Sequence, residues 1–117
     1  MKKSRIEEMI ERRIAERRSE ATEQAARALR ELTARGIRAW IVGSLAKGTF
    51  SLSSDVDLLV DCDAGSDSEA FLIIEAVFGE FPFHVLPYRR VREDVRLAMM
   101  EDALDAPGIR ARPPQAR

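Results

Sequence analysis

One stretch of the sequence decides the fold, and it reads Gly43-Ser44-Leu45-Ala46-Lys47-Gly48-Thr49-Phe50-Ser51-Leu52-Ser53-Ser54-Asp55-Val56-Asp57-Leu58-Leu59-Val60. Its last six residues alternate between acidic and apolar and then end in an apolar run, a pattern that predicts a β-strand. Successive side chains of a strand point to opposite faces. We therefore expect Asp55 and Asp57 to share one face, with Val56 and Leu58 on the other.

The first part of the stretch predicts a loop that binds phosphate groups. Gly43 and Ser44 directly follow residues 38–42, a short segment that we predict to be a buried strand. Glycine lets the backbone come close to a ligand, and exposed backbone N–H groups in such a turn can cradle phosphate oxygens. Ser44 adds a hydroxyl group, Lys47 adds a positive charge, and Gly48 permits a second turn.

The two aspartates predict a metal site beside this loop. Two residues apart on a strand, Asp55 and Asp57 have Cα atoms about 6.5 Å apart, close enough for both carboxylates to meet a metal pair spaced roughly 3.5–4 Å. Mg²⁺ favours a few carboxylates together with substrate phosphates. The alternative is a plain loop and a charged edge strand, but acidic groups in a Val/Leu-rich strand are costly without a partner.

The rest of the chain predicts an α+β fold in which a small mixed β-sheet is flanked by helices and preceded by a long N-terminal helix. Residues 4–35 lack Gly and Pro and are rich in Ala, Glu and Arg, and Gly36 ends this helix. The remaining expected elements are strands at 38–42, 55–60 and 82–87, a helix at 71–78 opened by a Ser66/Glu69 capping box, and a helix at 92–103 ended by Pro107-Gly108. We divide this single domain into a helical segment (1–35), a core (36–108) and a flexible basic tail (109–117).

Composition excludes several classes of protein. The chain has 117 residues, which is one domain by length. Charged residues make up 33% of it, yet the formal net charge is only −1, so nothing draws the whole molecule to nucleic acid or to an anionic membrane. We interpret the arginines of the N-terminal helix as a solvated face and not as an RNA-binding surface. With one cysteine, Cys62, and no long apolar run, we expect a cytoplasmic protein that does not contact membranes.

The quoted stretch resembles the G-S-x-x-x-G…S-D-x-D-L signature of the nucleotidyltransferase superfamily that includes DNA polymerase beta. The short chain is similar to the minimal nucleotidyltransferase branch, many of whose members are antitoxins paired with HEPN-domain toxins. The signature covers residues 43–60 only, and the predicted order of elements fits the palm-like fold of that superfamily.

The resemblance implies a role for each matching residue. It implies an NTP substrate, with ATP as the expected one, and one or two Mg²⁺ ions. Asp55 and Asp57 are then both catalytic and metal-binding. The residues implied to hold the nucleotide are Gly43, Ser44, Lys47, Gly48 and Ser54.

His84 departs from the family pattern. The family usually has a third carboxylate on the next strand, and here that strand carries His84. Imidazole is a poorer Mg²⁺ ligand than a carboxylate, but it can act as a general base near neutral pH. One hypothesis is an enzyme in which His84 is catalytic. The other is a weakened nucleotide-binding or antitoxin module that acts by protein contact, with His84 as an ordinary sheet-face residue.

The first half of the N-terminal helix predicts a protein partner. Its apolar stripe of Ile6, Met9, Ile10 and Ile14 lies beyond what a small core can cover. We expect this stripe to pack on a second copy of the chain, giving a homodimer, or on a HEPN-type partner. Because the core has little room to grip a large acceptor, such a partner is also the expected source of the acceptor hydroxyl.

Overall fold

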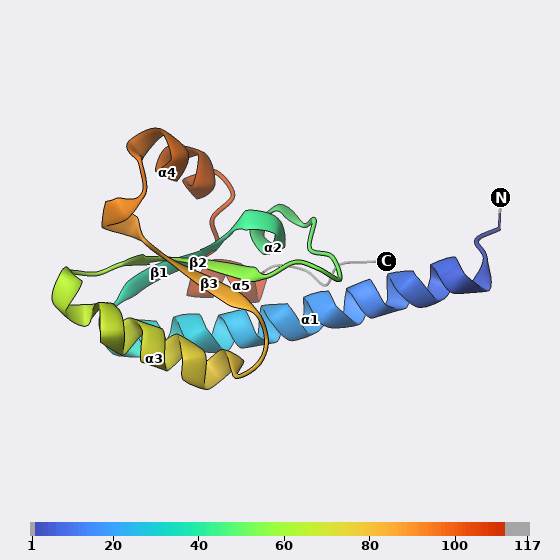
Figure 1. The fold of residues 1–117 in the computed structure, drawn as a ribbon, viewed down its shortest axis with the longest axis horizontal. Coiled ribbons are helices and arrows are strands. Elements are labelled where there is room, and N and C mark those ends of the chain that lie inside the picture. Colours follow the sequence, from blue (N-terminus) through green and yellow to red (C-terminus); the bar gives the residue numbers. More distant parts are fainter. Residues whose placement is uncertain (1, 112–117) are drawn as a thin grey trace.

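The computed structural model describes residues 2–111, which form a mixed β-sheet with helices on both faces (Figure 1). The strands are β1 (Arg38–Val42), β2 (Val56–Asp61) and β3 (Phe83–Pro87), in the order β1-β2-β3. β1 pairs antiparallel with β2, and β2 pairs parallel with β3. The helices are α1 (Arg5–Ala34), α2 (Gly43–Lys47), α3 (Asp67–Phe78), α4 (Glu93–Met100) and α5 (Ala106–Ala111). The predicted α+β class, mixed sheet and long N-terminal helix are confirmed.

The register of the sheet decides which residues share a face. Leu58 lies opposite Ile41 on one side and Val85 on the other. Ile41 and Leu58 are fully buried and belong to one core cluster with residues of α1 and α3. Asp57 lies opposite Val42 and His84 in the next row. Because alternate residues point to opposite faces, this row points away from α1. Val56 and Leu58 thus face the core opposite Asp57, as the sequence predicts.

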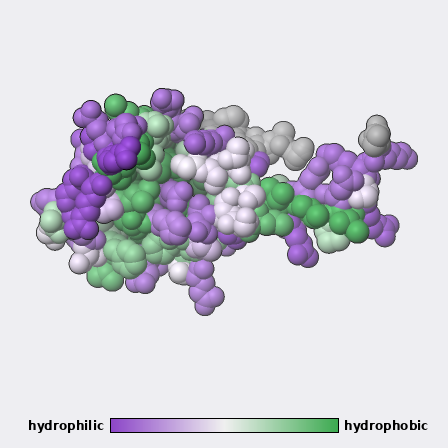
Figure 2. Space-filling model, turned by 45° about the horizontal axis from the view of Figure 1, so that its top comes forward, coloured by the Kyte–Doolittle hydropathy of each residue, from purple (hydrophilic) through white to green (hydrophobic). Residues whose placement is uncertain are grey.

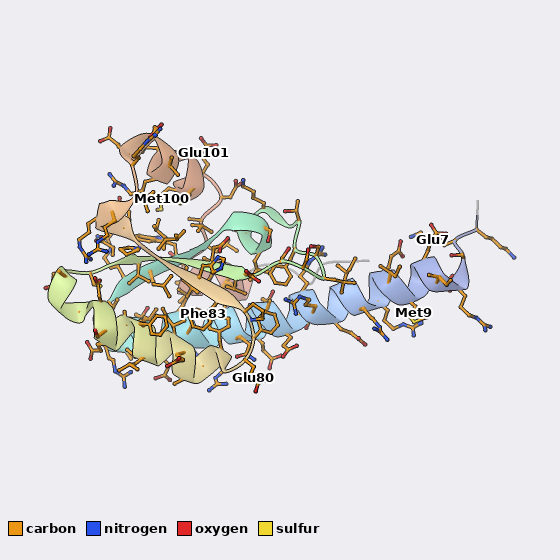
Figure 3. All side chains as sticks on the ribbon, viewed as in Figure 1. Glu7, Met9, Glu80, Phe83, Met100 and Glu101 are labelled. Atoms are coloured by element: carbon orange, nitrogen blue, oxygen red, sulfur yellow. The ribbon has the colours of Figure 1, made fainter. Side chains whose placement is uncertain are left out.

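α1 has two halves with different surroundings. A capping box starts the helix. Ser4 Oγ accepts the backbone N–H of Glu7 at 3.0 Å, and Glu7 Oε1 accepts the backbone N–H of Ser4 at 2.9 Å. The second half packs on the sheet through its buried small and branched residues, Ala21, Ala25, Ala28, Leu29 and Leu32. The first half projects beyond the sheet, with Met9 well away from it (Figure 3).

The projecting half carries an uncovered apolar stripe at three of the four predicted residues, whereas the fourth, Ile14, is half-buried. Ile6 is 66% exposed, Ile10 is 44% exposed and Met9 is 43% exposed. Apolar side chains line this part of α1 in the space-filling view (Figure 2). An apolar line on a projecting helix is a common feature of surfaces that bind another protein.

Three details of the predicted elements are wrong. Ser66 makes no side-chain cap and α3 begins earlier, at Asp67, while Asp63 Oδ1 accepts the N–H of Ser66 at 3.1 Å to close the preceding turn. The predicted 92–103 helix is shorter, because α4 covers Glu93–Met100. Pro107-Gly108 does not end helical structure either, since both residues lie inside α5.

α5 forms because proline is tolerated in the first turn of a helix, where its missing N–H is not needed. Asp105 Oδ1 accepts the N–H of Gly108 at 2.7 Å, as an N-cap does. Just before it, Leu104 and Ile41 exchange two backbone hydrogen bonds of 2.9 Å along the outer edge of β1. α5 packs on α1. Ile109, which we predicted to lie in the tail, is buried in this contact, with only 3% of its surface exposed. Residues 112–117 of the predicted tail lie outside the described residues.

No helix within residues 2–111 combines the length and the apolar content that a membrane span requires.

The burial of Ile109 predicts that α5 is part of the stable core. Ile109→Ala should lower the free energy of unfolding by about 2–4 kcal/mol, because it leaves a cavity beneath α5. Leu97→Ala, on a side chain that is 62% exposed, should change it by less than about 0.5 kcal/mol. Urea unfolding followed by circular dichroism measures both, and equal effects would show that α5 does not pack on the core.

Candidate active site

The site is built around a close approach between Gly43 and Asp57. Gly43 follows β1 directly and has a φ of +74°, a backbone conformation that favours glycine. A Cβ atom at this position would collide with Oδ2 of Asp57 and lie 3.3 Å from its Cγ. The Asp57 carboxylate therefore lies directly against the backbone of Gly43. The glycine turn and the acidic strand of the quoted stretch meet in one place.

Asp55, Asp57 and His84 form a cluster beside this turn. His84 Nε2 lies 3.3 Å from Oδ2 of Asp55, and His84 Nδ1 lies 3.4 Å from Oδ1 of Asp57. The imidazole thus spans both carboxylates. The parallel pairing of β2 with β3 causes this, because it places Asp57 directly opposite His84. The two aspartates and the histidine converge as the sequence predicts, although Asp55 itself lies one residue before β2.

The carboxylate of Asp57 is incompletely solvated. Burial raises the pKa of Asp57 above the ordinary aspartate value of 3.8, and the nearby charge of Asp55 adds to this, while His84 acts in the opposite direction. Partial burial disfavours the ionised form of a carboxyl group. A positive charge beside this carboxylate would therefore stabilise the ionised form of Asp57.

Two carboxylates fit a Mg²⁺ ion that completes its coordination elsewhere. Within residues 2–111 no three or more His, Cys, Asp or Glu side chains are arranged as a metal centre. Mg²⁺ is commonly held by one or two carboxylates together with water and substrate phosphates, and not by a closed protein cage. The donor set of Asp55 and Asp57 beside a glycine turn suits a cation that arrives with a phosphate-bearing substrate.

The other predicted nucleotide ligands lie in and after α2. Lys47 is exposed in the last turn of α2, and Gly48 ends this helix with a φ of +84°. Ser44 lies one residue after the Gly43 turn, and its carbonyl accepts the N–H of Thr49 at 2.9 Å. All three flank the same turn, and their contact with a nucleotide stays a prediction.

Ser54 organises the loop before Asp55. Its Oγ accepts the N–H of Ser51 at 2.9 Å and lies 3.0 Å from Ser51 Oγ. The Ser54 hydroxyl therefore closes the turn that leads into Asp55. Its predicted contact with a nucleotide also stays a prediction.

Two arginines of α1 contact the loop that leads into the site, and the sequence interpretation missed these contacts. Arg17 Nη2 donates to the carbonyl of Ser54 at 2.8 Å, and Arg18 Nη2 donates to the carbonyl of Phe50 at 3.3 Å. The interpretation of these two as part of a solvated face is wrong. A signal was present, because Arg17 lies four residues before the buried Ala21 and so continues the buried side of the helix.

The mixed sheet, the glycine turn and the paired carboxylates together define a nucleotidyltransferase fold. The family model described as "Nucleotidyltransferase domain" matches residues 22–105, which is well over half of the chain and includes Gly43, the two aspartates and His84. The chain belongs to the nucleotidyltransferase domain family. No curated protein and no solved structure matches it.

The raised pKa of Asp57 predicts a stability cost that depends on pH. A carboxyl group with a raised pKa in the folded state favours folding most at low pH, and this contribution is lost as pH rises through the raised value. Asp57→Asn should therefore be more stable than the wild type at neutral pH, and the gain should shrink as pH falls toward about 3, where Asp57 is protonated in both states.

Urea unfolding at several pH values between 3 and 8 measures this difference. Glu80→Gln removes one exposed carboxylate elsewhere and serves as the control. A constant difference between Asp57→Asn and wild type across this range would contradict the assignment.

Proposed function

We propose that the chain transfers a nucleoside monophosphate from a Mg²⁺-bound triphosphate, with ATP as the expected donor, to an acceptor hydroxyl on a partner protein. Family membership supports nucleotidyl transfer in general. The observation that carries the specific proposal is the Asp57 carboxylate, which lies against Gly43 and joins Asp55 at one imidazole. A single unpaired cysteine supports a reducing compartment such as the cytoplasm.

The residues of the site divide the work of the reaction. Asp55 and Asp57 hold the cation, and Gly43 and Ser44 offer backbone N–H groups to the triphosphate. Bound there, Mg²⁺ supplies positive charge that offsets the charge of the phosphates. The acceptor oxygen forms a bond to the α-phosphorus. The bond between the α-phosphorus and the oxygen that bridges to the β-phosphate breaks, and pyrophosphate leaves with that oxygen.

His84 is the proposed acceptor of the proton that the attacking hydroxyl loses. Its imidazole is next to both carboxylates and its side chain is 64% exposed, so an acceptor can approach it from solvent. A general base must come within hydrogen-bond reach of the proton it removes. This position is the one at which the family usually carries a third carboxylate.

A second function is favoured by the same histidine. The imidazole lies within 3.4 Å of both carboxylates and faces the oxygen atoms that would hold a cation. An imidazole in this position stands where a cation would bind. On this second proposal the chain is a catalytically weak nucleotide-binding or antitoxin module that acts through protein contact.

The partner in both proposals is a second copy of the chain or a HEPN-type toxin. The support is the exposed stripe on the projecting half of α1, where Ile6, Met9 and Ile10 are all more than 40% exposed. A partner that covers this stripe also provides surface on which an acceptor hydroxyl can be presented. We propose no contact with nucleic acid or membranes.

Nucleotide binding is the first test. Calorimetric titration with ATP, and then GTP, should show binding that requires Mg²⁺ and that weakens about 10–100-fold or more in Asp55→Ala, because half of the carboxylate pair is lost. Asp102→Ala removes an exposed aspartate from the turn after α4 and should leave binding unchanged. Absence of any Mg²⁺-dependent binding by the wild type would overturn the proposed function.

Substitution of His84 separates the two functions. His84→Asp supplies the third carboxylate. With the partner protein present to supply the acceptor hydroxyl, it should raise the rate of pyrophosphate release from Mg²⁺-ATP by about tenfold or more, and His84→Ala should be slower than the wild type. A rate that stays the same in all three proteins would exclude a role for this position. Activity in His84→Asp alone would support the weakened module.

A further inference from the structure

Arg17 lies at the boundary between the two halves of α1 and turns toward the sheet. It is one turn beyond Ile14 and one turn before the buried Ala21. Its guanidinium carbon is 4.7 Å from the ring centre of Phe81 and 5.6 Å from that of Phe50, two rings stacked 6.4 Å apart. Packing against two aromatic faces fixes the direction of the guanidinium.

The same guanidinium holds the chain immediately before Asp55. Arg17 Nη2 donates to the Ser54 carbonyl at 2.8 Å in a partly buried position. The Ser54 carbonyl and the Asp55 N–H belong to one planar peptide group, so the bond fixes that plane and with it the direction in which Asp55 leaves the loop. A hydrogen bond from a charged donor is stronger than one between neutral groups.

Arg17 also contacts the segment that leads to His84. Phe81 is three residues before His84, and the carbonyl of the intervening Pro82 accepts the N–H of Val56 at 3.1 Å. The Val56–Pro82 hydrogen bond thus connects the segment around Asp55 to the segment that leads to His84. The Arg17 side chain connects both segments to α1.

We propose that Arg17 is a positioning residue of the active site, which sets the separation of Asp55 and His84 by holding both entering loops against α1. Residue 17 lies outside the 22–105 range that the family model matches, so this role comes from the contacts of this chain. The expected effect on nucleotide binding rests on the proposed function, whereas the effect on the loops does not.

The test compares Arg17→Met, Arg17→Lys and Arg13→Met. Methionine keeps an apolar chain against the two rings but cannot donate to Ser54, whereas lysine keeps both the charge and a donor. Arg13→Met removes the same charge one turn earlier, at an exposed position of α1. Circular dichroism and the unfolding midpoint establish that each variant is folded.

The first readout is amide hydrogen exchange and amide chemical shifts in the protein without nucleotide. Arg17→Met should accelerate exchange and shift resonances at residues 50–56 and 81–84 together, because both loops lose their common anchor. Arg17→Lys should lie between this variant and the wild type, and Arg13→Met should match the wild type. Unchanged loops in a folded Arg17→Met protein overturn the proposal.

The second readout is Mg²⁺-dependent ATP affinity. Arg17→Met should weaken it about tenfold, with partial recovery in Arg17→Lys, as for other residues that orient metal ligands. Equal affinity of Arg17→Met and wild type overturns the positioning role even if the loops move. If the loops respond but the wild type binds no triphosphate, the proposed function fails while the anchoring of both loops by Arg17 stands.

Discussion

The contact between the Asp57 carboxylate and the backbone of Gly43 is the constraint on which the site depends. It requires a residue without a Cβ atom at the end of β1, because any Cβ would meet the carboxylate. It also requires the antiparallel register that places Val42 opposite Asp57. The Gly43 turn after β1 and the Asp57 carboxylate on β2 therefore form one structural unit that requires both strands. Its cost is the partial burial of a carboxylate, visible in the raised pKa of Asp57.

The parallel pairing of β2 with β3 adds the third member of this unit. α3 carries the chain from one strand to the other across the core face, so β3 enters beside β2 with His84 opposite Asp57. A slip of one residue in this pairing would move His84 to the core face and Val85 to the site. The apolar alternation that buries Leu58 beside Val85 thus also fixes the chemistry on the opposite face.

The sequence predicted those parts of the molecule in which a local pattern determines the structure. Alternation placed Asp57 and Val56 on opposite faces, and the third strand brought His84 to the expected position. Helical spacing placed Arg17 on the buried side of α1, but it did not identify the loop, 37 residues away in the sequence, that accepts its hydrogen bond. Pro107-Gly108 was misinterpreted as an end because proline breaks a helix interior but is tolerated in the first turn.

His84 determines how the carboxylate pair can be used. Its two ring nitrogens face the same oxygen atoms, on Asp55 and Asp57, that a cation would require. A buried imidazole held by further bonds would exclude a cation permanently. His84 instead is 64% exposed on β3, an edge strand of the sheet, and within residues 2–111 its polar contacts are those with the two aspartates. Because most of its surface faces solvent, the imidazole can turn away from the two carboxylates without leaving a cavity in the core, so its position is compatible with a cation at this pair.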